Sequence, residues 1–325
     1  MKAIVCKRYG GPEVLELADV PDLVPGPREV VVDVQACAVN LTDLLTIENK
    51  YQYPQELPFV PGGEVTGVVR LTGAEVDSVS VGDHVIAPGN TGGFAERKRV
   101  PASVVSVIPA GLDSVSAVGL MYSYGTVLYG LQELARLASG ASLLVLGASG
   151  GVGLAAVEVG KLLGARVIAC ASTDEKLAAC AERGADALVN YESEDLKARV
   201  RELTGGAGAD VVLDPVGGKY AEPALRATAW GGHYLVVGFA GGIPSIPLNH
   251  VLLRGASVTG VFMGSFRERE PGRAGLLTAQ VRDWWVSGAI KPYMSQQFPL
   301  SQTAEAMRLL QQRQVVGRAV VTPNS

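Results

Sequence analysis

The feature that most constrains the fold is a glycine-rich turn between a strand-like run and a helix-like stretch. Residues 143–146 are apolar, residues 147–153 read GASGGVG, and apolar residues at helical spacing follow. Glycines at such a junction allow a tight turn, close approach of the backbone to a pyrophosphate, and close packing of the helix on the strand. We therefore predict a dinucleotide-binding turn with these candidate residues: Gly147, Ser149, Gly150, Gly151, Val152 and Gly153.

Strand-like and helix-like segments alternate around this turn. The expected strands are residues 142–146, 166–170, 187–190, 209–213 and 232–237, and the expected helices are residues 152–163, 174–183, 194–203 and 221–229. This alternation is typical of right-handed βαβ crossovers, which give a doubly wound parallel sheet covered by helices. We predict an α/β fold in which residues 121–265 form a Rossmann domain. At the start of this domain, helical spacing of apolar residues predicts a helix over residues 114–139.

The remaining segments predict a second, β-rich domain. Short strand-like runs lie between Pro/Gly turns, as in a mostly antiparallel sheet. These runs are residues 30–36, 64–71 and 84–88. Residues 1–120 are expected to form this domain, and residues 266–325, which end in a strand-like run at 317–322, are expected to return to it. A chain of 325 residues is long enough to bury two cores.

Charge and cysteine usage exclude several classes of protein. The formal net charge is −4 and no long basic run is present, which argues against a nucleic-acid partner. The short basic run at residues 97–99 is predicted to be a solvent-exposed strand or loop edge. The four cysteines are dispersed without a CxxC pair, which indicates reduced thiols. The start of the chain lacks a signal-peptide pattern and the apolar region at 143–160 is broken by glycines, so we expect a cytoplasmic protein that does not span a membrane.

The end of the second expected strand indicates which nicotinamide cofactor binds. NAD enzymes usually place an acid there, about 20 residues after the turn, to hold both ribose hydroxyls. Residues 170–173 are Cys-Ala-Ser-Thr, so no acid repels a 2′-phosphate. Ser172 can donate a hydrogen bond to that phosphate, and Lys176 can supply a cation. Asp174 could accept from a ribose instead, but we interpret it as the N-cap of the next helix. NADP is therefore favoured.

Several motifs along almost the whole chain resemble one family. They are residues 38–43 (AVNLTD), 57–62 (LPFVPG), 147–153, 184–186 (GAD), 210–218 (DVVLDPVGG) and 231–238 (GGHYLVVG). With them the chain resembles the quinone oxidoreductase, or zeta-crystallin-like, branch of the medium-chain dehydrogenase/reductase superfamily. The resemblance implies a GroES-like β domain, built from both ends of the chain, around a Rossmann domain that binds NADPH. It also implies a homodimer paired through edge strands, for which the apolar stretch 256–263 is a candidate.

The resemblance also carries over particular cofactor-binding positions. Lys176 and Tyr191 match the Lys and Tyr that bind the 2′-phosphate in the quinone reductases of this family. Arg313, rather than Arg318, matches an Arg near the C-terminus that sometimes joins them. Four more residues match segments that the family places around the pyrophosphate and the nicotinamide: Thr126, Gly238, Phe239 and Phe262.

The metal ligands of zinc-dependent relatives are replaced in this sequence. Those relatives use Cys and His ligands because a carbonyl that becomes an alkoxide needs a Lewis acid. Asn40 stands where their Cys would be, and Gly63 stands where their Gly-His-Glu segment has His. The lobe with four structural cysteines is replaced by residues 90–94, and the three histidines are too dispersed to form a ligand set. We predict that no metal binds.

Without a metal, the expected acceptor is a quinone or a conjugated enone or enal, because a few hydrogen bonds can carry the charge that its reduction develops. Asn40 can donate to the carbonyl oxygen, and Asp43 is expected to order the Asn40 turn. Tyr51 or Tyr53, on the loop before residues 57–58, can close the site or deliver a proton. Packing within an aromatic loop is the other interpretation of the two tyrosines.

Two further functions stay open. The chain also resembles trans-enoyl reductases, which place a catalytic Tyr at the spacing that Tyr51 has from residues 57–58. An enoyl thioester, such as an acryloyl-CoA-like acceptor, is therefore an alternative substrate. The second possibility is an NADPH-binding protein without turnover, as among the lens crystallins of this family. Consumption of NADPH with a quinone separates that possibility from the enzymes, and no sequence feature names the acceptor.

Overall fold

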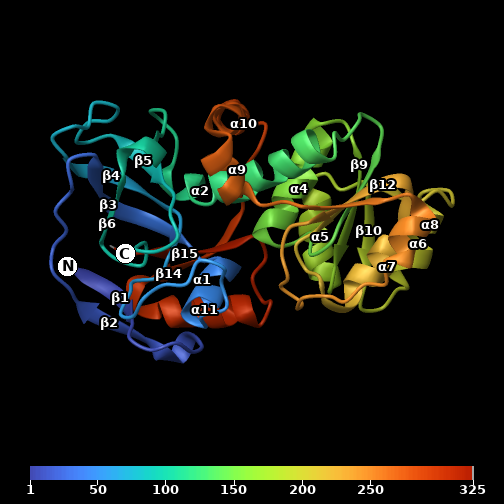
Figure 1. Cartoon of the computed structure of the whole chain (residues 1–325), viewed down its shortest axis with the longest axis horizontal. Helices are drawn as coiled ribbons and strands as arrows, with labels where there is room; N and C mark the ends of the chain where they lie inside the picture. The colour runs from blue at the N-terminus through green and yellow to red at the C-terminus, as the bar shows by residue number, and fades with distance from the viewer. Residues whose placement is uncertain (324–325) are drawn as a thin grey trace. The chain divides into compact units, whose positions relative to one another are not determined.

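The computed structural model describes residues 1–323 and contains two compact units (Figure 1). Unit 1 comprises Met1–Tyr122 together with the segment that begins at Pro292, and unit 2 comprises Ser123–Lys291. Both ends of the chain, blue and red in Figure 1, therefore contribute to unit 1. Within residues 1–323, no helix combines the length and the apolar character that crossing a bilayer requires.

Unit 2 contains a six-stranded parallel sheet, as predicted. The strand order is β10-β9-β8-β11-β12-β13, and every neighbouring pair is parallel. The strands are β8 (Ser142–Val145), β9 (Arg166–Ala171), β10 (Ala187–Asn190), β11 (Ala209–Asp214), β12 (Thr228–Val236) and β13 (Ser257–Gly260). The order reverses between β8 and β11, so right-handed crossovers put helices on both faces of the sheet. These helices are α4 (Gly151–Leu162), α5 (Asp174–Glu182), α6 (Leu196–Leu203), α7 (Ala221–Arg226) and α8 (Asn249–Arg254).

The last helices of unit 2 lie beyond residue 265, where the sequence predicts the Rossmann domain to end. They are α9 (Met263–Arg269) and α10 (Pro271–Val286). Phe266 of α9 stacks on Tyr129 with ring centroids 4.1 Å apart, and α10 packs against α9. These contacts keep both helices with unit 2 rather than with the returning tail.

The single helix predicted over residues 114–139 is interrupted, so that prediction is wrong. Helix α2 (Ser114–Ala117) stops, and helical structure resumes at Leu120. Gly119 lies between them with a φ of +81°, a conformation that favours glycine. A Cβ on Gly119 would lie 2.1 Å from the guanidinium of Arg318, which packs against this point. The helical spacing of apolar residues continues across the break because both pieces bury an apolar face, which hides the interruption in the sequence.

Unit 1 contains a seven-stranded sheet that is antiparallel except for the pair β14 and β15. The order is β14-β15-β3-β4-β5-β7, and β6 also pairs with β3. The strands are β3 (Glu29–Ala38), β4 (Val65–Thr72), β5 (His84–Ala87), β6 (Arg97–Pro101), β7 (Ser106–Val107), β14 (Met294–Pro299) and β15 (Arg318–Thr322). The pairing of β15 with β3 confirms that the tail returns to the first domain. Strands β1 (Lys2–Cys6) and β2 (Leu15–Asp19) form a separate antiparallel pair.

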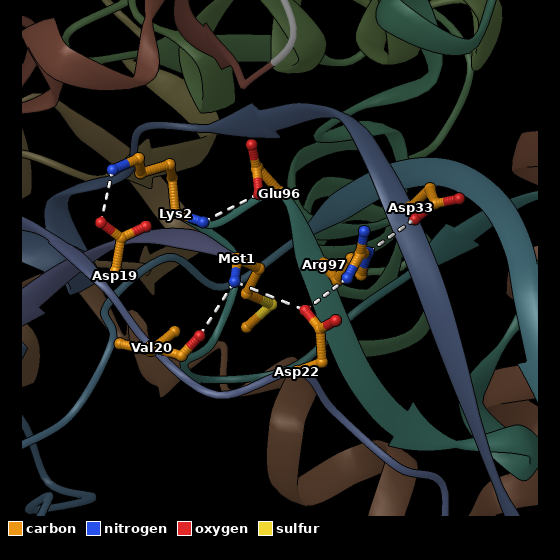
Figure 2. Close-up of polar contacts among 8 residues, drawn as sticks. All are labelled: Met1, Lys2, Asp19, Val20, Asp22, Asp33, Glu96 and Arg97. Atoms are coloured by element: carbon orange, nitrogen blue, oxygen red, sulfur yellow. Dashed lines mark hydrogen bonds and ion pairs between the residues drawn. The ribbon is translucent and has the colours of Figure 1, made fainter.

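Strand β6 carries the basic run, and its side chains alternate between the two faces of the sheet. Figure 2 shows Arg97 between Asp22, at 2.5 Å, and Asp33, at 3.3 Å. Arg99 is half-exposed, but Lys98 points the other way and is only 2% exposed. The prediction of a solvent-exposed run is therefore wrong for Lys98, because successive residues of a strand face opposite sides.

Candidate active site

The glycine-rich turn of unit 2 has the geometry of a pyrophosphate-binding loop. Gly147 has a φ of +55°, and a Cβ on it would lie 2.7 Å from Val216. A Cβ on Gly153 would lie 2.2 Å from the carbonyl oxygen of Gly147, so helix α4 packs directly on the turn. Gly150 is the N-cap of α4, and the helix start has neither a side-chain cap nor an acid in its first turn. The N–H groups and the positive end of the helix dipole therefore suit an anion.

A buried carboxylate orders the neighbouring loop after β11. Asp214 accepts hydrogen bonds from the N–H groups of Val216 at 2.7 Å and Gly217 at 2.8 Å, and from the hydroxyl of Tyr234 at 2.5 Å. Burial raises the pKa of Asp214, and these three donors lower it. Strands β8 and β11 end where the strand order reverses, which is where ligands bind in open α/β sheets. Asp214 thus holds the loop that faces Gly147 at this point.

The end of β9 brings Ser172 and Lys176 together. The Lys176 ammonium donates to the Ser172 hydroxyl at 3.1 Å. The prediction that Asp174 is the N-cap of α5 is wrong: Thr173 has the extended conformation before the helix, and its hydroxyl accepts from the N–H of Lys176 at 3.3 Å. The carboxylate of Asp174 instead accepts from the Asn190 side chain at 3.1 Å. Asp174 is thus engaged by the next strand along the sheet.

Tyr191 follows β10 and lies beside the end of β9, since its N–H donates to the carbonyl oxygen of Ala171 at 3.2 Å. Its ring packs on Tyr220 with centroids 4.2 Å apart. The Tyr220 hydroxyl donates to Glu192, which is also ion-paired with Lys219 at 2.9 Å. These contacts hold the Tyr191 ring at the carboxyl end of the strands, where Ser172 and Lys176 also lie.

The other predicted cofactor residues are divided between the two units. Those in unit 2, together with the glycine-rich turn, are Thr126, Gly238, Phe239 and Phe262. The rings of Phe239 and Phe262 are each about 40% exposed, which is unusual for large apolar side chains. Arg313 belongs to unit 1, where it follows helix α11 (Thr303–Gln311) with a φ of +59°.

In unit 1, Asn40 is the N-cap of helix α1 (Leu41–Ile47). Its N–H donates to the carboxylate of Asp43 at 2.8 Å, which confirms that Asp43 orders the Asn40 turn. The Arg318 guanidinium donates to Asn40 Oδ1 at 3.4 Å, and Asn40 Nδ2 donates to the Ala38 carbonyl oxygen at 3.4 Å. Because a guanidinium only donates, it turns the amide oxygen toward itself and leaves the amide nitrogen as the donating end.

A buried pair of opposite charges adjoins this turn. Asp43 accepts from the N–H groups of Asn40, Gly62 and Gly63, and the Lys98 ammonium donates to the carbonyl oxygen of Gly63. Burial raises the pKa of Asp43 to about 7 and lowers the pKa of Lys98 to about 8. The attraction between the two charges opposes both shifts. Both groups are therefore mostly charged only between about pH 7 and pH 8.

Three tyrosines and a threonine form the second polar group of unit 1. The rings of Tyr51 and Tyr53 meet edge to face with centroids 5.7 Å apart. The Tyr122 hydroxyl donates to Thr42 Oγ1 at 3.1 Å. Burial raises the pKa of both Tyr51 and Tyr122. Helix α1 thus anchors Tyr122 through Thr42.

Glu64 is buried and binds backbone. Its carboxylate accepts from the N–H groups of Met121 at 3.3 Å and Tyr122 at 3.2 Å. It follows Gly63, so the acid of the relatives' Gly-His-Glu segment is kept while the His is replaced. Among residues 1–323, no three His, Cys, Asp or Glu side chains lie close enough to hold a metal ion together.

Sequence reasoning missed Lys98, Tyr122, Thr42 and Glu64. The two-residue period of a strand separates Lys98 from its basic neighbours, and this signal was present in residues 97–101. Thr42 stands inside the family motif AVNLTD, but the motif does not reveal its hydroxyl partner. Tyr122 has no local signal, because its partners are about 60 to 80 residues earlier in the chain.

Comparisons with known proteins indicate one family along nearly the whole chain. The family model described as "Alcohol dehydrogenase GroES-like domain" matches residues 26–110, and that described as "Zinc-binding dehydrogenase" matches residues 151–278. The quinone oxidoreductase-like protein 2 homolog of Nematostella vectensis is 37% identical over 324 residues, which are 98% of this chain and 88% of that relative. The quinone oxidoreductase of Pseudomonas syringae is 32% identical, with a TM-score of 0.93 over 99% of both chains. The Escherichia coli quinone oxidoreductase, solved in complex with NADPH, is 26% identical, with a TM-score of 0.92 over 99% of this chain and 100% of that one.

Proposed function

We propose an electron acceptor for this enzyme. The chain belongs to the quinone oxidoreductase branch of the medium-chain dehydrogenase/reductase superfamily and is an NADPH-dependent oxidoreductase. The proposed acceptor is a quinone or a conjugated enone or enal. The observation that carries the proposal is the Asn40 amide, whose oxygen is engaged by Arg318 so that its nitrogen donates. Such a donor suits a carbonyl oxygen that gains negative charge.

Three side chains at the carboxyl ends of neighbouring strands in unit 2 support NADPH as the cofactor. Ser172 and Lys176 follow β9, and Tyr191 follows β10, so a 2′-phosphate there meets a hydroxyl, a cation and a phenol. The carboxylate that could repel it, Asp174, is bonded to Asn190. The glycine-rich turn and the start of α4 suit the pyrophosphate. Bound NADPH supplies the hydride.

The acceptor follows from the residues at the former metal positions. Asn40 and Gly63 stand where zinc-dependent relatives have Cys and His, so the chain offers a neutral hydrogen-bond donor in place of a Lewis acid. A simple ketone reduced to an alkoxide demands more stabilisation than one amide donor gives. A quinone or an enone spreads the developing charge over a conjugated system. We therefore also propose that the enzyme acts without zinc.

The source of the proton separates two kinds of acceptor. Hydride addition to the β-carbon of an enone or enoyl thioester leaves an enolate, whose α-carbon must then be protonated. A reduced quinone keeps its charge on oxygen and takes protons from water. We propose Tyr51 as the proton donor in the first case, because it has the spacing from residues 57–58 at which trans-enoyl reductases place their catalytic Tyr. The enoyl thioester stays the second candidate substrate, because its reduction uses the proton donor that Tyr51 offers.

Side-by-side kinetics with a quinone, an enone and an enoyl-CoA test the proposal. Positioned proton transfer typically contributes about 10²–10⁴-fold, so Tyr51→Phe should lower kcat for the enone or enoyl-CoA by that order and leave quinone reduction nearly unchanged. The matched variant is Tyr53→Phe: a loss there instead makes Tyr53 the donor. Absence of NADPH consumption with every acceptor would favour a non-catalytic, crystallin-like NADPH-binding protein.

We further propose a cytoplasmic homodimer. Strand β13 is an edge of the unit 2 sheet, as expected for the stretch 256–263, and Val258 on it is exposed. An exposed apolar edge strand favours pairing with a second copy. The free, buried cysteines suit a reducing compartment.

A further inference from the structure

We propose that Tyr220 is the positioning residue that holds the Tyr191 ring at the 2′-phosphate site and so favours NADPH over NADH. The inference rests on the proposed role of Tyr191 as a ligand of that phosphate. Tyr191 lies in the turn between β10 and α6, outside any helix or strand. The turn by itself leaves the side chain several rotamers, so the ring takes a fixed orientation only through its contacts. Tyr220 makes such a contact, with ring centroids 4.2 Å apart and ring planes inclined by 36°.

Tyr220 is itself held firmly within unit 2. It is 5% exposed and belongs to the apolar core that includes residues of β8, β9 and β11. Its N–H donates to the carbonyl oxygen of Gly217 at 3.3 Å, and the N–H of Gly217 donates to the buried carboxylate of Asp214 at 2.8 Å. Asp214 ends β11 and orders the loop beside the glycine-rich turn. Residues 214–220 thus connect the pyrophosphate-binding turn to the turn that carries Tyr191.

The hydroxyl of Tyr220 contacts the same turn a second time. It donates to the carboxylate of Glu192, the residue after Tyr191, and Glu192 is also ion-paired with Lys219 at 2.9 Å. Burial, and then the hydrogen bond to Glu192, raise the pKa of Tyr220, so its hydroxyl keeps its proton and can donate at neutral pH. An acid beside Tyr191 would repel a 2′-phosphate, and these two contacts offset its charge. Tyr220 thus fixes the ring of one turn residue and engages the carboxylate of the next.

A fixed Tyr191 ring favours only a cofactor that the ring binds. Ordering a mobile side chain on binding costs affinity, and a ring that is already in place avoids this cost. NADH lacks the 2′-phosphate, so the orientation of Tyr191 does not enter its binding. The loss of Tyr220 should therefore lower the affinity for NADPH and leave that for NADH nearly unchanged. A general loosening of unit 2 would weaken both.

The first test compares the dissociation constants of the two cofactors in Tyr220→Met. Methionine fills the buried space without an aromatic face. We expect the Kd for NADPH to rise about 2- to 10-fold, the usual effect of one side chain that must be ordered on binding, and the Kd for NADH to stay within about 2-fold. Tyr220→Phe keeps the ring and should retain the wild-type preference, since Lys219 still pairs with Glu192. The control is Leu225→Ala, which opens a cavity in the same core and should not change the ratio of the two constants.

The second test needs neither turnover nor the nicotinamide. Calorimetry compares the binding of adenosine 2′,5′-bisphosphate, which carries the 2′-phosphate, with that of adenosine 5′-monophosphate. Tyr191→Leu should weaken the binding of the bisphosphate, and adding Tyr220→Met should weaken it little further, because Tyr220 then has no ring to hold.

The outcomes separate the inference from the proposal on which it rests. Unchanged binding of the bisphosphate in Tyr191→Leu overturns the proposed role of Tyr191. A loss in Tyr191→Leu without one in Tyr220→Met, or equal losses for the two nucleotides in Tyr220→Met, overturns the inference. Tyr220→Phe decides the matter even where the methionine variant does not fold: a loss of NADPH preference as large as that of Tyr191→Leu would show that the ring contact has no effect.

Discussion

Replacing Lys98 with methionine should destabilise unit 1 by up to about 3–5 kcal/mol at pH 8, because it leaves the buried Asp43 carboxylate without the opposite charge of the nearby ammonium. Lys98 is 2% exposed, Asp43 is 1% exposed, and the ammonium is bonded to the carbonyl oxygen of Gly63. Methionine preserves most of the apolar stem. The variant therefore isolates the effect of the charge: it leaves a buried carboxylate without its cation and a buried carbonyl oxygen without that donor.

The pKa shifts of Asp43 and Lys98 predict how the cost of Lys98→Met changes with pH. The pKa of Asp43 is raised from 3.8 to about 7 in the folded protein, so its protonation favours folding at low pH and this contribution is lost as the pH rises through about 7. The pKa of Lys98 is lowered from 10.5 to about 8, so deprotonation favours folding at high pH and this contribution is lost as the pH falls through about 8. Without Lys98, Asp43 takes up a proton at a higher pH. The cost of Lys98→Met should therefore shrink from pH 8 to pH 6.

The neighbouring strand residue supplies the matched control. Arg99→Met removes an exposed cation whose partner, Glu29, is 3.3 Å away, and such surface pairs contribute about 0–1 kcal/mol. Adding Asp43→Asn to Lys98→Met should recover part of the stability, because the unpaired charge is then absent.

Amide hydrogen exchange of strands β3 and β6 is the suitable measurement. The three tryptophans, residues 230, 284 and 285, all belong to unit 2, so their fluorescence does not report on unit 1. Exchange of slow amides gives the opening free energy of the strands themselves. Equal losses in Lys98→Met and Arg99→Met, or a Lys98→Met cost that does not change between pH 6 and pH 8, would refute the reasoning.

Three other predictions concern the cofactor, the metal and the assembly. Lys176→Ala should raise the KM for NADPH about 10- to 100-fold and leave NADH use nearly unchanged, since one charge-assisted hydrogen bond contributes roughly 1.5–3 kcal/mol; equal wild-type use of both cofactors contradicts this. Prolonged chelation should leave activity intact, and elemental analysis should find no stoichiometric zinc; zinc that tracks with activity would overturn the metal-free proposal. Val258→Lys should convert a dimer to a monomer by light scattering, because a charge on the β13 edge opposes strand pairing. A monomeric wild type at micromolar concentration speaks against the dimer.

Local patterns were enough to predict the parallel sheet and the cofactor turn. Strand and helix periods in unit 2 are regular, and Gly153 is required by a close contact with Gly147, which lies six residues earlier in the same turn. The break at Gly119 was not predictable, because its cause is Arg318, which comes nearly two hundred residues later. The hydrogen bond between Tyr122 and Thr42 was hidden for the same reason, because the two residues meet only after unit 1 has folded. Contacts between residues far apart in the chain leave no periodic pattern in the sequence, so the chemistry that depends on them cannot be predicted from it.

The position of β15 beside β3 has a consequence for how the protein is made. Strand β3 ends at Ala38, and the strand that pairs with it begins at Arg318, so nearly the whole chain must be synthesised before that pairing can form. Unit 2 is continuous from Ser123 to Lys291 and can complete its sheet first. At about 5–20 residues per second, β3 waits for roughly tens of seconds on the ribosome with the Cys37–Ala38 end of one edge unpaired, since β6 pairs only with residues Glu29–Asp33. An unpaired strand edge invites pairing with other chains, so the interval before residue 318 emerges is when the nascent protein is most prone to aggregate.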